Sequence, residues 1–238
     1  MDRRGFIKGT GLAAAALAVP ARLPAQPLVA SPRDMRLMEI AKRELEKAGS
    51  AIWHRDLVGI SDYGVHSRLP RFHFVDLMAG RVDSMLVSHG TGSDPEHDGW
   101  LNWFSNVPNS NASSRGAYVT WEWYVGKYGV SVRLGGLDPT NNNALDRAIV
   151  AHRAAYAEPG HIERWGRLGR SNGCFAFGQD DFDRVLSQLS GGRLIYSESL
   201  GIAEDGSTIA GPSPYVPETR PLMPATPNTF ERLNPGAW

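Results

Sequence analysis

The sequence predicts a mainly β (α+β) domain with a few flanking helices. Short runs with strand-like alternation recur through the middle of the chain, and turns containing glycine connect them. Apolar residues follow helical spacing in only two long stretches, 33–48 and 179–189. The expected strands are 71–76, 81–88, 117–125, 129–134, 148–152 and 193–197.

The N-terminus is expected to be an export signal. Arg3, Arg4 and Lys8 precede a short apolar run at 12–19, and small residues follow. This order is typical of a signal peptide, and the arginine pair resembles the twin-arginine motif. The apolar run is shorter than the ~20 residues that span a bilayer. We therefore expect residues 1–25 to be a twin-arginine-type signal peptide, with an uncleaved anchor as the alternative, and the mature protein to be periplasmic with no membrane span.

The rest of the chain divides into three parts. Residues 26–54 are expected to form an N-terminal helical segment, because Leu37 and Ile40 begin an apolar face at helical spacing. Residues 55–198 hold the main domain, and residues 199–238 form a proline-rich tail. The formal net charge is zero and no basic stripe occurs, so we expect no nucleic-acid partner.

Cys174 is the only cysteine in the chain. In an exported protein, structural cysteines occur in pairs, and a single one cannot form an intrachain bridge. The preceding loop, 167–173, is polar, basic and rich in glycine. Nearby cations and backbone N–H groups favour a thiolate. We interpret Cys174 as a nucleophile, with a buried inert thiol as the alternative.

A thiol nucleophile needs a general base. Two histidines follow strongly apolar strand patterns: His89 comes after 85–88, and His152 ends 148–152. Strand ends are places where a rigid scaffold presents side chains to a site. His152 is the nearer of the two to Cys174, and we assign it as the base. A structural histidine is the alternative.

The loop around the thiol offers further groups. The backbone N–H groups of Gly173 and Cys174 are candidate oxyanion donors, because glycine permits a tight turn and a close approach of substrate. Ser171 can hydrogen-bond within the loop or to the substrate. Arg170 is a candidate for holding a substrate carboxylate, with a surface salt bridge as the alternative.

A strand-end histidine followed by Ser-x-Gly-Cys resembles the L,D-transpeptidase (YkuD-like) catalytic domain. The whole set of motifs more closely resembles the murein L,D-transpeptidase branch with extended spacing, over roughly residues 55–198. The segments that carry this resemblance are 87–90, 104–106, 113–116, 124–126, 134–137, 148–152 and 166–174.

The resemblance implies an L,D-transpeptidase-like β-sandwich or barrel of mixed strands and a two-step acyl transfer. One peptidoglycan stem peptide is the donor that forms a thioester with Cys174, and an amine of a second stem is the acceptor. The base is oriented by a backbone carbonyl, and no cofactor or metal is implied. The substrate-binding residues that the resemblance suggests are His89, Asn172, Arg153, Ser105 and Asn106.

Two positions depart from the family pattern. Asn172 stands where the broad family often has histidine, and Arg153 follows the base where glycine is common in the branch. A bulky cation beside the base narrows the groove or recruits an acidic substrate group. We therefore expect these two positions to influence the choice of donor or acceptor.

Three other functions are compatible with parts of the sequence. With water as the acceptor, the same chemistry gives an L,D-carboxypeptidase or endopeptidase. A metal peptidase lacks a recognised ligand spacing, although acidic and histidine residues are available. A non-catalytic wall-binding module is the third; aromatics at 121 and 123 share one face of a strand and are more often core. The potential metal ligands are His89, Asp94, Glu96, His97, Asp98 and His152, and the potential binding aromatics are Trp100, Trp103, Trp121 and Trp123.

Overall fold

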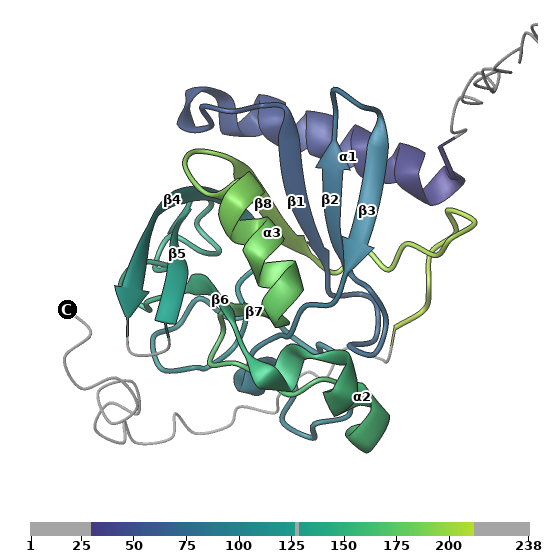
Figure 1. Cartoon of the computed structure of the whole chain (residues 1–238), viewed down its shortest axis with the longest axis vertical. Helices are drawn as coiled ribbons and strands as arrows, with labels where there is room; N and C mark the ends of the chain where they lie inside the picture. Colours follow the sequence, from purple (N-terminus) through teal and green to yellow (C-terminus); the bar gives the residue numbers. More distant parts are fainter. Residues whose placement is uncertain (1–29, 127–128, 212–238) are drawn as a thin grey trace, which may run out of the picture.

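A computed structural model describes residues 30–126 and 129–211. Their strands form one mixed sheet of eight, in the order β3-β2-β1-β8-β4-β5-β6-β7 (Figure 1). This agrees with the predicted mainly β class. The strands are β1 Leu57–Asp62, β2 Phe72–Asp76, β3 Arg81–Met85, β4 Gly116–Gly126, β5 Gly129–Gly136, β6 Val150–Arg153, β7 Phe175–Phe177 and β8 Leu194–Glu198.

Two of the strand pairs are parallel, namely β1 with β8 and β6 with β7, and the other pairs are antiparallel. The two edge strands of the sheet are also linked to each other. Just after β3, the Ser88 N–H donates to the Ala176 carbonyl of β7 at 2.9 Å. Gly90 then pairs with Ser171. The sheet therefore curls towards closure, and this seam holds the segment before the cysteine.

Helices cover the curled sheet on different sides. α1 (Pro32–Ala48) begins at Ser31, whose Oγ accepts from the Asp34 N–H at 3.1 Å, as expected for an N-cap. α3 (Gln179–Leu189) lies across another part of the sheet, and the short α2 (Pro159–Trp165) stands beyond the ends of β6 and β7 (Figure 1). Among the described residues, no helix has the length and apolar character needed to cross a membrane.

Alternate residues of the strands build two cores. Along β1, Val58 and Ile60 face the cluster that contains the buried side chains of α1. Gly59 faces the other way, where a Cβ atom would lie 2.6 Å from the ring of Phe72. Phe72 belongs to the second cluster, together with α3 and both aromatic residues of β7. This second core supports the cysteine.

The expected helices at 33–48 and 179–189 are confirmed, and so are both hairpins, although the strand expected at 81–88 ends at Met85. The strand expected at 148–152 instead spans Val150–Arg153. The Ile149 N–H donates to the Ala144 carbonyl at 2.8 Å, so this residue still belongs to the preceding turn. The sequence reading missed β1, β7 and α2, because the first two lack clear alternation and the third has only seven residues.

The two tryptophans of β4 do not share an environment. The ladder between β4 and β5 shifts register between Thr120 and Trp123. Trp121 packs against the α1-side core, whereas Trp123 is 57% exposed. The expectation that both are core residues is therefore wrong for Trp123.

The proposed segment boundaries remain predictions. The signal peptide at 1–25 lies outside the described residues, and so does 212–238 of the expected tail. The described part of the tail, 199–211, is held on the body by the Asp62 carboxylate, which accepts from the N–H groups of Gly201 at 2.7 Å and Ile202 at 2.9 Å.

The packing of α1 predicts that a substitution in this helix can lower the stability of the fold without changing the reactivity of Cys174. Leu37 is fully buried against the α1-side core, so Leu37→Ala should lower the free energy of unfolding by about 2–5 kcal/mol in urea denaturation. The alkylation rate of Cys174 in the folded protein should not change, because the thiol rests on the other core. Met35→Ala is the matched control, since Met35 is 51% exposed on the same helix. Equal stability of the two variants would contradict this account of the core.

Candidate active site

Cys174 stands immediately before β7, at the end of a loop that begins at Gly166. The three residues that follow it are almost fully buried, and the Phe175 ring packs edge-on against Tyr118 with 5.3 Å between ring centroids. The thiol itself is half-buried. A rigid apolar strand therefore anchors the nucleophile.

The parallel pairing of β6 with β7 brings His152 to Cys174. Ala151 is opposite Phe175 in the register, so the imidazole and the thiol are neighbours, and each shifts the pKa of the other. The Nδ1 atom of His152 lies 2.9 Å from the backbone carbonyl of Arg153. A carbonyl only accepts, so Nδ1 carries the proton and Nε2 is the nitrogen left for the sulfur.

Opposing effects set the pKa values of this pair. Burial disfavours the Cys174 thiolate, but the hydrogen bond and positive charge of His152 outweigh it, so the thiol pKa lies below its ordinary value. Burial also disfavours the imidazolium, and the bond to Cys174, the thiolate charge and the Arg153 carbonyl outweigh it and raise the pKa of His152. Each group therefore favours the charged form of the other.

Backbone groups just before β6 also surround the sulfur. The Val150 N–H hydrogen-bonds to the Cys174 side chain and helps to lower its pKa. The Ala148 carbonyl lies 3.6 Å from Sγ and can accept the thiol proton in the neutral form. Ala148 has a φ of 50°, a left-handed conformation that is uncommon for a residue other than glycine. This strained turn aims both backbone groups at the sulfur.

Arg147 is a site residue that the sequence analysis missed. Its guanidinium donates to the Ser105 carbonyl at 2.8 Å and to the Ala112 carbonyl at 2.5 Å. Its positive charge also favours the Cys174 thiolate. The signal in the sequence was an arginine placed directly before the apolar stretch that ends on the base.

Gly173 fits between Arg147 and the loop that Arg147 holds. Its φ is 106°, and a Cβ atom there would lie 2.6 Å from the Ala112 carbonyl and 3.1 Å from Arg147 Nη2. The position therefore requires glycine for both conformation and space. In this structure the Gly173 N–H donates to Ser171 Oγ at 3.1 Å, so this candidate oxyanion donor already has a partner.

Ser171 holds together the loop that carries the nucleophile (the nucleophile loop, 166–174) through its hydrogen bonds. Its hydroxyl donates to the Cys174 carbonyl at 2.7 Å. Its own N–H donates to the His89 carbonyl at 2.9 Å, and its carbonyl accepts from the Thr91 N–H at 2.8 Å. Ser171 is buried, so of its two expected roles the structure shows the bond within the loop.

A family model for the L,D-transpeptidase catalytic domain matches residues 33–197. The chain belongs to this family. The match begins in α1 and ends in β8, so it spans the whole sheet and includes the Cys174–His152 pair.

Solved L,D-transpeptidases are similar to this chain at low identity. One from Mycobacterium smegmatis is 15% identical over 60% of this chain and 58% of its own, with a TM-score of 0.36. One from Mycobacterium tuberculosis is 15% identical over 60% and 57%, with a TM-score of 0.39. One from Xylanimonas cellulosilytica is 12% identical over 66% and 68%, with a TM-score of 0.34. The match thus spans less than two thirds of the two mycobacterial chains, and no curated protein matches this chain.

In this L,D-transpeptidase domain, His89 is placed differently from the expectation. It is 1% exposed, its Nδ1 lies 2.6 Å from Arg71 Nη2, and its Nε2 lies 3.1 Å from Asp94 Oδ2. Both ring nitrogens are therefore occupied inside the protein. The prediction that His89 binds substrate is corrected: the residue supports the nucleophile loop through its carbonyl bond to Ser171.

The remaining candidates lie around the loop at different depths. Asn172 is exposed beside the thiol. Arg170 donates to the backbone carbonyl of Asp94, so its guanidinium is partly used in holding the loop. Arg153 is exposed and donates to Gln179 Oε1 at 2.7 Å, beside the start of α3. Of these three, Asn172 and Arg153 keep an exposed position next to the pair.

Ser105 and Asn106 form a wall of the site and are not direct neighbours of the sulfur. The Ser105 carbonyl accepts from Arg147, and the Asn106 amide donates to Asn142 Oδ1 at 2.7 Å and to the Pro139 carbonyl at 3.1 Å. The wall thus ties two loops together beside the site.

The described residues contain no cluster of three or more His, Cys, Asp or Glu side chains arranged to hold a metal ion. Asp94 is bound to His89 and to the N–H groups of Asp98 and Gly99. Asp94, His97 and Asp98 are therefore engaged in loop structure.

The buried His89 predicts a loss of stability in acid. Burial, followed by the charge of Arg71, lowers its pKa from 6.5 to about 4. Between these values the unfolded chain binds a proton that the folded chain does not, so stability falls as pH falls from 6.5 towards 4. Urea denaturation should show that wild type loses on the order of 3 kcal/mol more over this interval than His89→Gln, which can still bond both partners. Parallel pH dependences of the two proteins would contradict this placement.

Proposed function

We propose that this protein is an exported peptidoglycan L,D-transpeptidase that cross-links stem peptides through a thioester on Cys174. Residues 1–25 would direct it to the periplasm, by the twin-arginine route. The observation that carries the proposal is the Cys174–His152 pair, brought together by β6 and β7, with Nδ1 of the base fixed on the Arg153 carbonyl. In a family of this activity, that pair is the group of atoms with the chemistry to transfer an acyl group.

In the first step, the Cys174 thiolate attacks the carbonyl carbon of an L,D peptide bond in the donor stem. The carbonyl electrons move to oxygen, and a tetrahedral intermediate forms. As it collapses, the C–N bond breaks, and the His152 imidazolium gives its proton to the leaving amine. A D-amino acid departs and a thioester remains on Cys174.

In the second step, His152 is neutral and accepts a proton from the amine of an acceptor stem. The amine nitrogen attacks the thioester carbonyl, and a second tetrahedral intermediate expels the thiolate. The new amide is the cross-link, and the proton rests again on His152. No external reductant or energy source enters, because the energy of the donor peptide bond is kept in the thioester.

The oxyanion of each intermediate would bind the backbone N–H groups of Gly173 and Cys174. The Gly173 N–H would exchange its bond to Ser171 Oγ for one to the charged oxygen. A hydrogen bond to an anion is stronger than one to a neutral hydroxyl, so the exchange favours the transition state over the resting loop. This arrangement gives the Ser171 hydroxyl the role of holding the Gly173 N–H group in place between turnovers.

Product analysis tests the proposal. Purified protein incubated with tetrapeptide muropeptides should produce cross-linked dimers and release one D-amino acid per bond formed, measured by liquid chromatography and mass spectrometry. Cys174→Ala should abolish the products because the nucleophile is lost, and His152→Gln should reduce them at least about 100-fold because the base is lost. Both variants should keep the wild-type thermal unfolding temperature within a few degrees.

The products separate the candidate functions. Shortened stems without dimers would show that water is the acceptor and would sink the transferase proposal in favour of a carboxypeptidase. Full activity in Cys174→Ala would contradict thiol chemistry altogether. Binding to peptidoglycan without any product would favour a non-catalytic module.

A further inference from the structure

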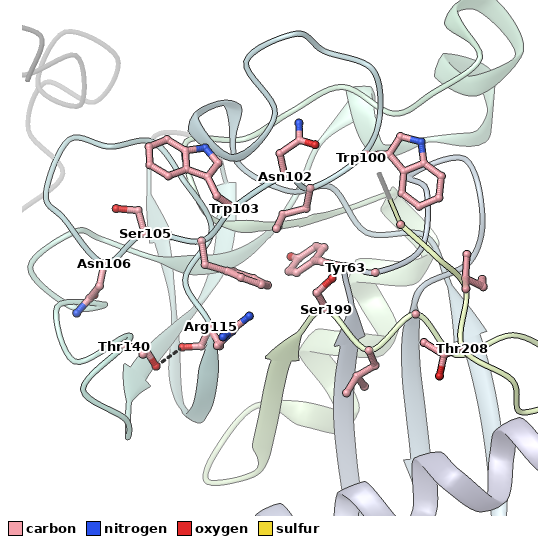
Figure 2. A pocket seen from close by; sticks show the side chains of 17 residues that line it. Tyr63, Trp100, Asn102, Trp103, Ser105, Asn106, Arg115, Thr140, Ser199 and Thr208 are labelled. Atoms are coloured by element: carbon pink, nitrogen blue, oxygen red, sulfur yellow. Dashed lines mark hydrogen bonds between the residues drawn. The ribbon is translucent and has the colours of Figure 1, made fainter. Parts of the chain in front are cut away.

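A large pocket lies beside the proposed active site and is not used in the proposed chemistry. Its volume is about 730 Å³, and most of its described lining residues come from the 100–106 loop and from the first part of the C-terminal region, 199–211, with further ones from Tyr63, Gly64, Arg115 and Thr140. Cys174 and His152 are not among them. Figure 2 shows Trp100 and Trp103 on one rim with Asn102 between them, while Thr208 lies on another side of the pocket.

The aromatic residues of the rim are held in place before any ligand arrives. The Trp103 indole N–H donates to the Gly92 carbonyl, which fixes the ring. The Trp100 ring packs edge-on against His66, with 5.2 Å between centroids. The backbone between them is tied by the Asn102 N–H, which donates to the Ser93 carbonyl at 2.9 Å. A preformed apolar surface of this kind binds a ligand without a large cost in ordering.

The charge of the lining restricts the class of ligand. Arg115 is the one charged side chain among the described lining residues, and its Nε lies 3.0 Å from Glu198 Oε1. Its guanidinium also lies over the Phe104 ring, 5.1 Å from the centroid. The other polar groups are amides and hydroxyls. Because the cation is already paired, the pocket fits a neutral molecule that has apolar faces and several hydrogen-bonding groups.

The pocket is joined to the nucleophile by two contacts. Tyr63 lines it and packs on Phe175, the residue after Cys174, with 6.3 Å between ring centroids. Ser105 forms part of its wall, and the Ser105 carbonyl accepts from Arg147, which abuts Gly173. The pocket and the nucleophile are therefore supported by some of the same residues.

Resting on the proposed function, we infer that this pocket binds an uncharged N-acetylhexosamine unit of the glycan strand. A pyranose ring has apolar C–H faces that stack on indoles, and its hydroxyl and acetamido groups suit amide and hydroxyl partners. The stem peptide is the less suitable occupant, because its carboxylate and ammonium groups require free charges that the described lining lacks. Binding energy from the sugar, remote from the reacting bond, would position the donor stem.

Saccharide binding by the full-length protein tests this inference. Calorimetric titration with the β-1,4-linked N-acetylglucosamine tetramer should give saturable binding to wild type. Trp103→Ala should weaken it roughly tenfold through loss of a stacking surface. Thr208→Trp should weaken it as well by filling the pocket from an exposed position, with little risk to folding. Trp165→Ala is the matched control, because this exposed tryptophan lies on α2 and not in the pocket.

A kinetic comparison adds a readout that involves the reaction. Wild type should have a lower KM for a disaccharide tetrapeptide than for the free tetrapeptide, and Thr208→Trp should remove this difference. No saccharide binding by wild type, or equal binding by all four proteins, would overturn the inference. So would an equal KM for both donors in wild type.

The failure of this inference is distinguishable from the failure of the proposed function. Intact-mass measurement of a carbapenem adduct on Cys174 does not depend on the sugar pocket. Adduct formation without saccharide binding would overturn the pocket assignment alone. Saccharide binding without an adduct would leave the pocket standing and count against the acyl-enzyme.

Discussion

The pairing of His152 with Cys174 is the interaction on which the rest of the site depends. It requires β6 and β7 to be parallel neighbours, because only this pairing brings the two residues side by side from positions separated by a long crossover. The crossover contains α2 and the polar loop that ends at Gly173. The curled sheet supplies the constraint: its two edge strands meet at the Ser88–Ala176 bridge, and the second aromatic core fixes β7 below the thiol.

The loops that connect the strands of the curled sheet near the site have little regular secondary structure. Arginine side chains inside the protein hold these loops in place. Arg71 is fully buried and donates to the carbonyls of Val87 and Val65 as well as to His89, so it organises the segment that leads from β3 to the seam. Arg147 performs a similar task for the loop between Ser105 and Ser114, and it adds a positive charge near the sulfur. Buried backbone carbonyls need donors, and the planar guanidinium supplies several from one side chain. The loops around the thiol are therefore rigid without regular secondary structure.

The sequence predicted the class of fold, most of its elements and the meeting of Cys174 with His152, because apolar periodicity and a lone thiol are local signals. It did not predict the burial of His89. A histidine after an apolar run reads as a strand-end residue, and only the tertiary structure shows that Arg71 and Asp94 enclose it. Arg147 was missed for a related reason: its hydrogen-bond partners are more than 30 residues away in sequence. The pocket beside the site could also not be predicted from the sequence. Its walls come from segments about 100 residues apart, and no local pattern connects them.

The pH dependence of Cys174 alkylation by iodoacetamide tests the central claim most directly, because it reports the thiolate that the pair is built to stabilise. The reactive form of wild type should appear with a midpoint below the ordinary thiol value of about 8.5. His152→Gln should move the midpoint upward, and Arg147→Gln should move it upward by less, in the order of their effects on the thiol. A wild-type midpoint at or above the ordinary value, or one that His152→Gln leaves unchanged, would contradict the account.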